Sequence, residues 1–211
     1  MSSRKTLQTI AAISRSASPG PTPAFTAVHV CRAIMLIGDK GPIGRIELSR
    51  ILGLGEGAVR TIIKHLSSSG FVDPAKDGCL LTQRGVVLYR SLRSKLSEIH
   101  PVNARQLALD RASAAVLVRN SSAAVRRGIE QRDAAIRAGA TGACTLIYRN
   151  ERLIMPMADR EDWTLAAKDS LSVDLQKIFA PRNGDVIAIV SAPSMGLAEH
   201  SAVACALTLL G

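Results

Sequence analysis

The side chains between residues 57 and 64 are the best suited to bind a ligand. Gly57, Arg60, Thr61 and Lys64 recur at steps of three and four residues, which places them on one face of a helix. A guanidinium hydrogen-bonds guanine through two atoms, whereas an ammonium contacts phosphate as a point charge. We therefore expect a short cationic helix face that binds double-stranded DNA, with Arg60 contacting a base and Lys64 a phosphate.

Two other cations lie near this segment in the sequence. Arg45 begins the preceding apolar segment, and Lys76 lies in the expected turn at residues 74–78. We expect Arg45 to contact phosphate, which positions a protein on DNA without reading its sequence, and Lys76 to reach a neighbouring phosphate or the minor groove. The alternative is that these cations only solvate an exposed surface. His65 lies beside the core face, so we expect it to pack or hydrogen-bond within the protein.

The positive charge of the chain is concentrated in its first half. Residues 1–100 contain 14 Lys and Arg against 6 Asp and Glu, which gives +8, whereas residues 101–211 contain 13 against 11, which gives +2. Nucleic acid is the first partner to consider, because neutralising phosphates releases counterions, and an acidic membrane surface is the second. The longest apolar runs fall short of the roughly 18–20 residues that span a bilayer, so no membrane-spanning helix is expected. Of the two partners we expect double-stranded DNA and no membrane.

Helices and a hairpin must position the cationic face. Apolar residues at helical spacing predict helices over residues 25–37, 45–52 and 57–69. Two short strands at residues 71–73 and 79–81 are expected to form a hairpin. The residues expected to face the core are Ile46, Leu48, Ile51 and Leu52 in the second helix and Val59, Ile62, Ile63 and Leu66 in the third.

A further helix over residues 82–96, capped by Thr82, is expected to close this domain. Its apolar stripe is wider than one small domain needs, which favours a homodimer. Two copies would present two DNA-binding helices about one DNA turn apart.

The stretch LSRILGLGEGAVRTIIKHLSSSGFVDPAKDGCLLTQRG resembles the winged helix-turn-helix family. Within it, LGLGEGAVRTIIKHLSSSGFV resembles the turn, recognition helix and first wing strand, and LTQRG resembles the run into the last helix. The resemblance covers about residues 24–96. It implies that Gly57, Arg60, Thr61 and Lys64 face the DNA groove and that the protein regulates transcription.

The expected fold class is α+β, with three regions along the chain. Residues 1–23 are basic, rich in serine and free of acidic residues, and they end in a proline-rich run, so they predict a flexible basic arm. Residues 24–100 form the winged helix-turn-helix domain. Residues 101–211 form a small α/β domain for effector sensing or dimerisation.

In the second domain we expect strands at residues 113–118 and 185–191, a hairpin at 144–156, and three helices. The helices are expected over residues 129–138, 171–179 and 197–210. The whole chain resembles archaeal proteins that join a winged helix to an uncharacterised α/β domain. The stretches QRDAAIRAGATGACTLIYRNERLIMP and NGDVIAIVSAP carry this resemblance.

Six residues of the second domain are candidates for binding a small-molecule effector. They are Arg132, Asp133, Thr141, Gly142, Ser191 and Ser194. A loop of small residues lets a ligand approach the backbone, and a helix start after a strand offers free amides to an anion. The alternatives are plain connections between elements and a surface ion pair.

Other functional classes are disfavoured. The four cysteines are far apart, which indicates reduced thiols in a cytoplasmic protein and neither zinc nor disulfides. Asp185, Ser191, Ser194 and His200 are the best hydrolytic set, yet the chain has neither a G-x-S-x-G motif nor a phosphate loop. We therefore expect no enzyme activity and no cofactor. A protein-interaction module and a nonspecific DNA-binding protein remain the alternatives.

Overall fold

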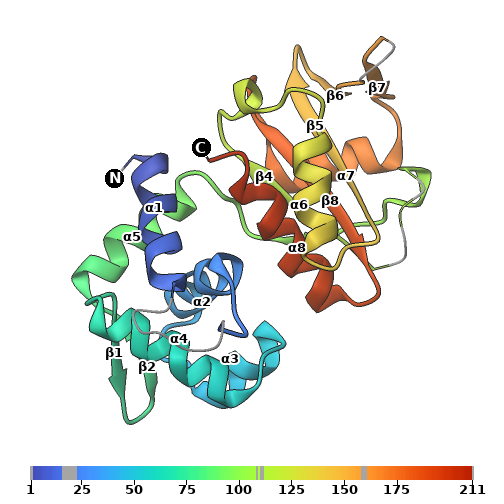
Figure 1. Cartoon of the computed structure of the whole chain (residues 1–211). Coiled ribbons are helices and arrows are strands. Elements are labelled where there is room, and N and C mark those ends of the chain that lie inside the picture. Colours follow the sequence, from blue (N-terminus) through green and yellow to red (C-terminus); the bar gives the residue numbers. More distant parts are fainter. Residues whose placement is uncertain (1, 16–22, 108, 110–111, 158–160, 211) are drawn as a thin grey trace. The chain divides into compact units, whose positions relative to one another are not determined.

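The computed structural model describes residues 2–15, 23–107, 109, 112–157 and 161–210 (Figure 1). The chain divides into two compact units, Met1–Arg93 and Ser94–Gly211. Within the described residues, no helix is both long enough and apolar enough to cross a bilayer.

The described part of the first unit consists of five helices and a hairpin. Its elements are α1 (Ser3–Ser14), α2 (Ala27–Lys40), α3 (Arg45–Leu52), α4 (Glu56–Ser68), β1 (Val72–Ala75), β2 (Gly78–Leu81) and α5 (Gln83–Arg93). The order from α2 onward is the one predicted from the sequence. The hairpin projects beyond the helices of this unit (Figure 1).

A tight turn joins α3 to α4. Gly53 ends α3 in the left-handed conformation with φ 67°, and its N–H bonds the carbonyl of Ser49, an arrangement that favours glycine. Helix α4 then buries the four residues that the periodicity predicted to face inward, Val59, Ile62, Ile63 and Leu66. The opposite face of α4 is exposed to solvent at Gly57, Arg60 and Lys64.

The loop before α3 pairs with strand β2 of the hairpin through one antiparallel bridge. Ile43 and Cys79 exchange two backbone hydrogen bonds of 3.3 and 2.9 Å. Gly78 has φ 132°, and a Cβ atom there would lie 2.7 Å from the Ile43 backbone. Only glycine fits this approach, so residue 78 fixes how closely the hairpin lies against the rest of the unit.

The prediction that residues 1–23 form a flexible arm is wrong for Ser3–Ser14, which form α1. Ser2 caps this helix, and Thr6, Ile10 and Ile13 are buried. Thr6 Oγ1 lies 2.7 Å from Ser91 Oγ of α5, and α1 also contacts α2 and α4. Residues 16–22 of the predicted arm lie outside the described residues.

Helix α5 begins where predicted, because Thr82 Oγ1 accepts a hydrogen bond of 3.1 Å from the Gly85 amide. Part of the apolar stripe that predicted a dimer is covered by α1, and Val87 is left 55% exposed. Ile46 was predicted to face the core but is 73% exposed in the first turn of α3. Leu48 and Leu52, which were also predicted to face the core, form the buried side of α3.

The second unit is built on one six-stranded antiparallel sheet in the order β3-β4-β8-β5-β6-β7. Its strands are β3 (His100–Pro101), β4 (Ala112–Val118), β5 (Gly142–Arg149), β6 (Arg152–Met155), β7 (Trp163–Leu165) and β8 (Val186–Ala192). Its helices are α6 (Ile129–Arg137), α7 (Ser170–Phe179) and α8 (Met195–Leu207), with short 3-10 turns η1 (Arg105–Leu107) and η2 (Ser122–Ala124). The α+β class predicted from the sequence is confirmed.

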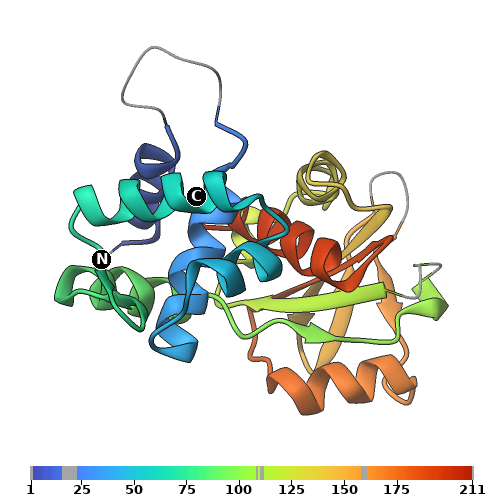
Figure 2. The same cartoon turned by 90° about the horizontal axis from the view of Figure 1, so that it is seen from below.

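Helices cover both faces of this sheet (Figure 2). Leu171, Leu175 and Phe179 of α7 pack with Leu146 and Ile187 on one face. Helices α6 and α8 lie on the other face, where Ala114, Ala192 and Ala198 pack together. These small side chains let α8 lie close to the strands.

The second unit begins before the boundary predicted at residue 100. The Ser97 amide bonds the Leu117 carbonyl at 3.0 Å, and the Arg119 amide bonds the Lys95 carbonyl at 2.8 Å. The segment after α5 is therefore tied to β4 rather than to the first unit.

Candidate nucleic-acid interface and candidate ligand pocket

The outward face of α4 carries the cationic residues predicted from the sequence. Arg60 and Lys64 are exposed, and so is Gly57 near the start of the helix. Thr61 is half-buried, and its hydroxyl donates a hydrogen bond of 3.0 Å to the Gly57 carbonyl. Because a hydroxyl that donates can still accept, Thr61 keeps an acceptor on this face.

Arg45 and Lys76, which are far apart in the sequence, line one cavity of about 300 Å³. Residues 74–79 of the hairpin form one side of this cavity, and Ile63 contributes from α4. Arg45 also lies close enough to Cys79 for its charge to act on that thiol. Arg45, predicted to contact phosphate, and Lys76, predicted to reach a phosphate or the minor groove, therefore line a single concave surface between the start of α3 and the hairpin.

Acidic residues of the first unit are partly neutralised away from the α4 face. Lys40 Nζ lies 2.8 Å from Glu47 Oε1, and Arg93 forms an ion pair with Asp39. The charge of these carboxylates is thus balanced locally. Arg60 and Lys64 are exposed on α4.

His65 has the structural role that the sequence analysis favoured. Its Nδ1 lies 2.9 Å from the Ile13 carbonyl and donates to it. Its ring also meets Phe25 edge-on, with centroids 5.7 Å apart. These contacts tie α4 to α1 and to Phe25, so His65 packs and hydrogen-bonds within the unit.

The six effector candidates do not form one site. Thr141 Oγ1 lies 3.2 Å from Ser191 Oγ, and Ser191 Oγ lies 3.5 Å from the Gly142 carbonyl. Ser194 caps α8 by accepting from the Leu197 amide. Arg132 and Asp133 pair with each other at 3.5 Å on α6.

The antiparallel sheet weakens the reasoning that selected these candidates. In a parallel sheet the carboxyl ends of the strands share one edge and form a ligand crevice there. Here neighbouring strands run in opposite directions, and β8 pairs with β4 and β5 in antiparallel register. The turn from β8 into α8 is therefore not a crevice of that type.

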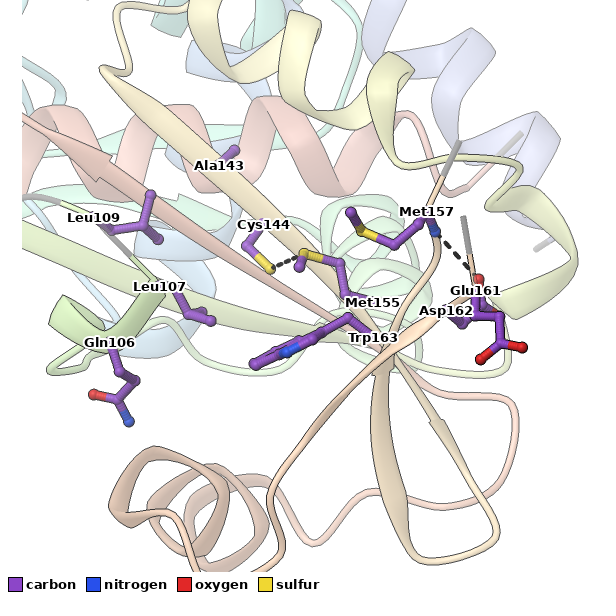
Figure 3. Close-up of a pocket in the computed structure, with 10 residues that line it drawn as sticks. All are labelled: Gln106, Leu107, Leu109, Ala143, Cys144, Met155, Met157, Glu161, Asp162 and Trp163. Carbon is purple, nitrogen blue, oxygen red and sulfur yellow. Dashed lines mark hydrogen bonds between the residues drawn. The ribbon is translucent and has the colours of Figure 1, made fainter. Parts of the chain in front are cut away.

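A pocket of about 710 Å³ was missed by the sequence analysis. It lies where η1 meets strands β5, β6 and β7 (Figure 3). Its described lining consists of Gln106, Leu107, Leu109, Ala143, Cys144, Met155, Met157, Glu161, Asp162 and Trp163. The single tryptophan of the sequence was the available signal, but nothing local connects it to Leu107 or Cys144.

The pocket adjoins the small cluster at Gly142. A Cβ atom on Gly142 would lie 2.9 Å from Leu109 Cδ2 and 3.3 Å from Ser191 Oγ. Leu109 lines the pocket, so Gly142 and Ser191 lie directly behind one wall of it. Three of the predicted effector residues, including Thr141, are thus near a cavity that the sequence did not reveal.

The cysteines are buried free thiols. Burial raises the pKa of Cys31, Cys144 and Cys205 to about 12, and it also raises the pKa of Cys79. Protonated thiols are poor nucleophiles and poor metal ligands. No group of three or more His, Cys, Asp or Glu side chains that suits a metal ion occurs among the described residues.

Asp185, one of the residues considered for hydrolysis, holds loops of the second unit together through hydrogen bonds. Its buried carboxylate accepts hydrogen bonds from Arg119 Nη1 at 2.7 Å, the Asn120 amide at 2.8 Å and the Arg182 amide at 2.9 Å. These three donors fix the loops at one end of β8. Ser191, by contrast, is at the other end of this strand.

The two units match two families of protein domains. Residues 30–87 match the family described as "PH0730-like, N-terminal domain". Residues 109–209 match the family described as "Domain of unknown function (DUF4443)". A search of curated proteins finds no match to the chain.

Among solved structures, the chain is similar to "Hypothetical protein PH0730 from Pyrococcus horikoshii OT3". The TM-score is 0.65 at 28% sequence identity, and the match covers 86% of this chain and 91% of that chain. The resemblance to two-domain archaeal proteins is therefore confirmed, although none of these descriptions states a function. Residues 30–87 and residues 109–209 are therefore similar to these two domain families, each over less than half of the chain.

Proposed function

We propose that this protein binds double-stranded DNA sequence-specifically, as a transcriptional regulator, and that its second unit senses a small ligand. The observation that carries the proposal is the exposed face of α4, where Gly57, Arg60 and Lys64 surround Thr61. A helix of this width fits the major groove, which is about 12 Å wide. Arg60 contacts a guanine edge, and Lys64 contacts phosphate.

The cavity lined by Arg45 and Lys76 extends this surface. A DNA strand that leaves the groove beside α4 meets these two cations, which neutralise its phosphates. The hairpin, whose turn contains Lys76, projects beyond the helices of the first unit (Figure 1), as a wing that follows the duplex does. Helix and hairpin together supply both base contacts and backbone contacts.

Two other functions use the same fold. A protein-interaction module would not require cations on the exposed α4 face, and the +8 charge of residues 1–100 favours a polyanion instead. A nonspecific DNA-binding protein would use the cations but not discriminate between sequences. A homodimer on DNA stays part of the proposal, although the α5 stripe supports it less now that α1 covers part of it.

The decisive experiment is selection of bound duplexes from a random pool, followed by titration of the selected and a scrambled duplex across salt concentrations. A shared motif with preferential binding supports a sequence-specific regulator, and the spacing of its half-sites tests the dimer. Equal and strongly salt-dependent binding of both duplexes indicates nonspecific binding. Absence of binding at low salt contradicts the proposal and favours the interaction module.

A further inference from the structure

We propose that the 710 Å³ pocket of the second unit is a binding site for a small organic cation with an apolar body. Its volume lies within the roughly 300–1,000 Å³ of ordinary ligand sites. That a ligand in this pocket regulates DNA binding rests on the proposed function. That the pocket binds a ligand does not, since ligand binding is measured without DNA.

The walls of the pocket are apolar and supported by the core. Leu107, Leu109 and Met155 pack against the buried cluster beneath α7, to which Cys144 belongs. Cys144 Sγ donates to Met155 Sδ over 3.3 Å, which fixes these two side chains side by side (Figure 3). A preformed wall of this kind binds an apolar group with little loss of side-chain entropy.

The polar groups of the described lining are mainly oxygen acceptors. Gln106 donates its side-chain amide to Asp169, the capping residue of α7, which leaves its carbonyl oxygen available. Asp162 Oδ1 accepts from the Met157 amide at 3.2 Å, and Glu161 adds a second, exposed carboxylate. Among the described lining residues, the carboxylates of Glu161 and Asp162 favour a ligand that is positively charged and donates hydrogen bonds.

Trp163 supplies a second attraction for a cation. Its indole lies beneath Met155 and Cys144 and extends toward Leu107 (Figure 3), and 39% of the residue is exposed. Tryptophan is the aromatic side chain that binds cations best through its ring face. Indole and carboxylates in one apolar pocket are the combination that recognises organic ammonium groups.

Trp163 also provides the assay, because it is the only tryptophan in the chain. We suggest titrating the full-length protein with 2-phenylethylamine, 2-phenylethanol and phenylacetate, while recording tryptophan emission. The three probes share a phenyl group and differ in charge. We expect the amine to bind about five- to tenfold more tightly than the alcohol, and phenylacetate to bind most weakly.

Substitutions of the two carboxylates test whether they cause the preference for the amine over the alcohol. Glu161→Gln and Asp162→Asn should each reduce the preference for amine over alcohol, and Asp162→Asn keeps the Oδ1 acceptor for the Met157 amide. Glu130→Gln, which removes an exposed carboxylate from α6 on the other face of the sheet, should leave it unchanged. An unchanged preference in both pocket variants would overturn the assignment of the carboxylates.

The proposal also fails if phenylacetate or the alcohol binds as tightly as the amine. It fails equally if no probe changes the emission of Trp163 up to about 10 mM, a concentration that detects even very weak complexes. Because DNA is absent from this titration, its failure leaves the DNA-binding proposal intact. Failure of the DNA selection likewise leaves the pocket result unaffected.

Discussion

Arg60 and Lys64 lie one helical turn apart on α4, and the proposed function gives them different tasks. Arg60→Ala should lower discrimination between the selected and scrambled duplexes by about 1–3 kcal/mol, because a bidentate contact to guanine is lost. Lys64→Ala should weaken binding to both duplexes and reduce the slope of log affinity against log salt by about 1. Fluorescence anisotropy over a range of salt concentrations measures both effects.

The matched control is Arg90→Ala, which removes an exposed cation from α5 rather than from α4. We expect it to change neither discrimination nor salt slope. If Arg90→Ala weakens binding as much as Lys64→Ala does, the interaction depends on net charge and not on the α4 face.

His29 makes the stability of the first unit depend on pH. Its Nδ1 accepts a hydrogen bond of 3.1 Å from the Thr26 amide at the start of α2. Burial, and then the charge of Arg32, lowers the pKa of His29 from 6.5 to about 4. Between these two pH values, residue 29 of the unfolded chain binds a proton that the folded chain excludes. The contribution of neutral His29 to the free energy of unfolding is therefore complete above pH 6.5 and is lost as the pH falls toward 4.

His29→Gln keeps an acceptor for the Thr26 amide without titrating in this range. We expect the thermal midpoint of the wild-type protein to fall more steeply than that of the variant between pH 6.5 and pH 4. The other three histidines are present in both proteins, so the difference reports His29 alone. Parallel pH profiles would show that residue 29 does not control this dependence.

At the scale of elements, α1 is the part of the first unit that the sequence analysis did not anticipate. Ile10 is 1% exposed, and α1 contacts α2, α4 and α5. Ile10→Ala should therefore lower the free energy of unfolding by about 2–5 kcal/mol, through lost burial and an unfilled cavity. Urea titration followed by circular dichroism measures this change.

Gln8→Ala is the control within the same helix, because Gln8 is exposed. Its effect should stay within about 0.5 kcal/mol. Equal effects of the two substitutions would mean that α1 does not stabilise the unit, and the interpretation of residues 3–14 as a flexible arm would return.

The sequence predicts elements well where periodicity acts locally. The inward face of α4 follows from apolar residues at steps of three and four, and the Thr82 cap follows from its position before a helical pattern. In α1 only Thr6, Ile10 and Ile13 are buried, and their pattern is short and lies within a basic, serine-rich segment. The burial of this helix depends on α5 and α4, which local spacing does not reveal.

The ligand pocket illustrates the same limit. Leu107 comes from η1, Cys144 from β5 and Trp163 from β7, and only the strand order brings them together. That order is not encoded in the periodicity of any one segment. The Thr141, Gly142 and Ser191 cluster was found because a loop of small residues is a local signal, and it proved to lie behind the pocket wall.

For the whole molecule, the division into two compact units predicts two separable unfolding events. The only tryptophan, Trp163, belongs to the second unit, so its emission reports the unfolding of that unit alone. Circular dichroism of the helices reports both. A comparison of the two signals therefore separates the two events in the intact chain.

One substitution in each unit tests this prediction. Ile10→Ala should shift the transition seen by circular dichroism while leaving the Trp163 transition in place. Asp185→Asn should shift the Trp163 transition, because the amide nitrogen that replaces one carboxylate oxygen faces groups that themselves donate. These are either the Asn120 amide or Arg119 together with the Arg182 amide, and the cost is about 2–3 kcal/mol. If Ile10→Ala also shifts the Trp163 transition, the two units unfold as one cooperative structure. A ligand bound beside Trp163 would then also stabilise the first unit against unfolding, whereas separate transitions would confine that stabilisation to the second unit.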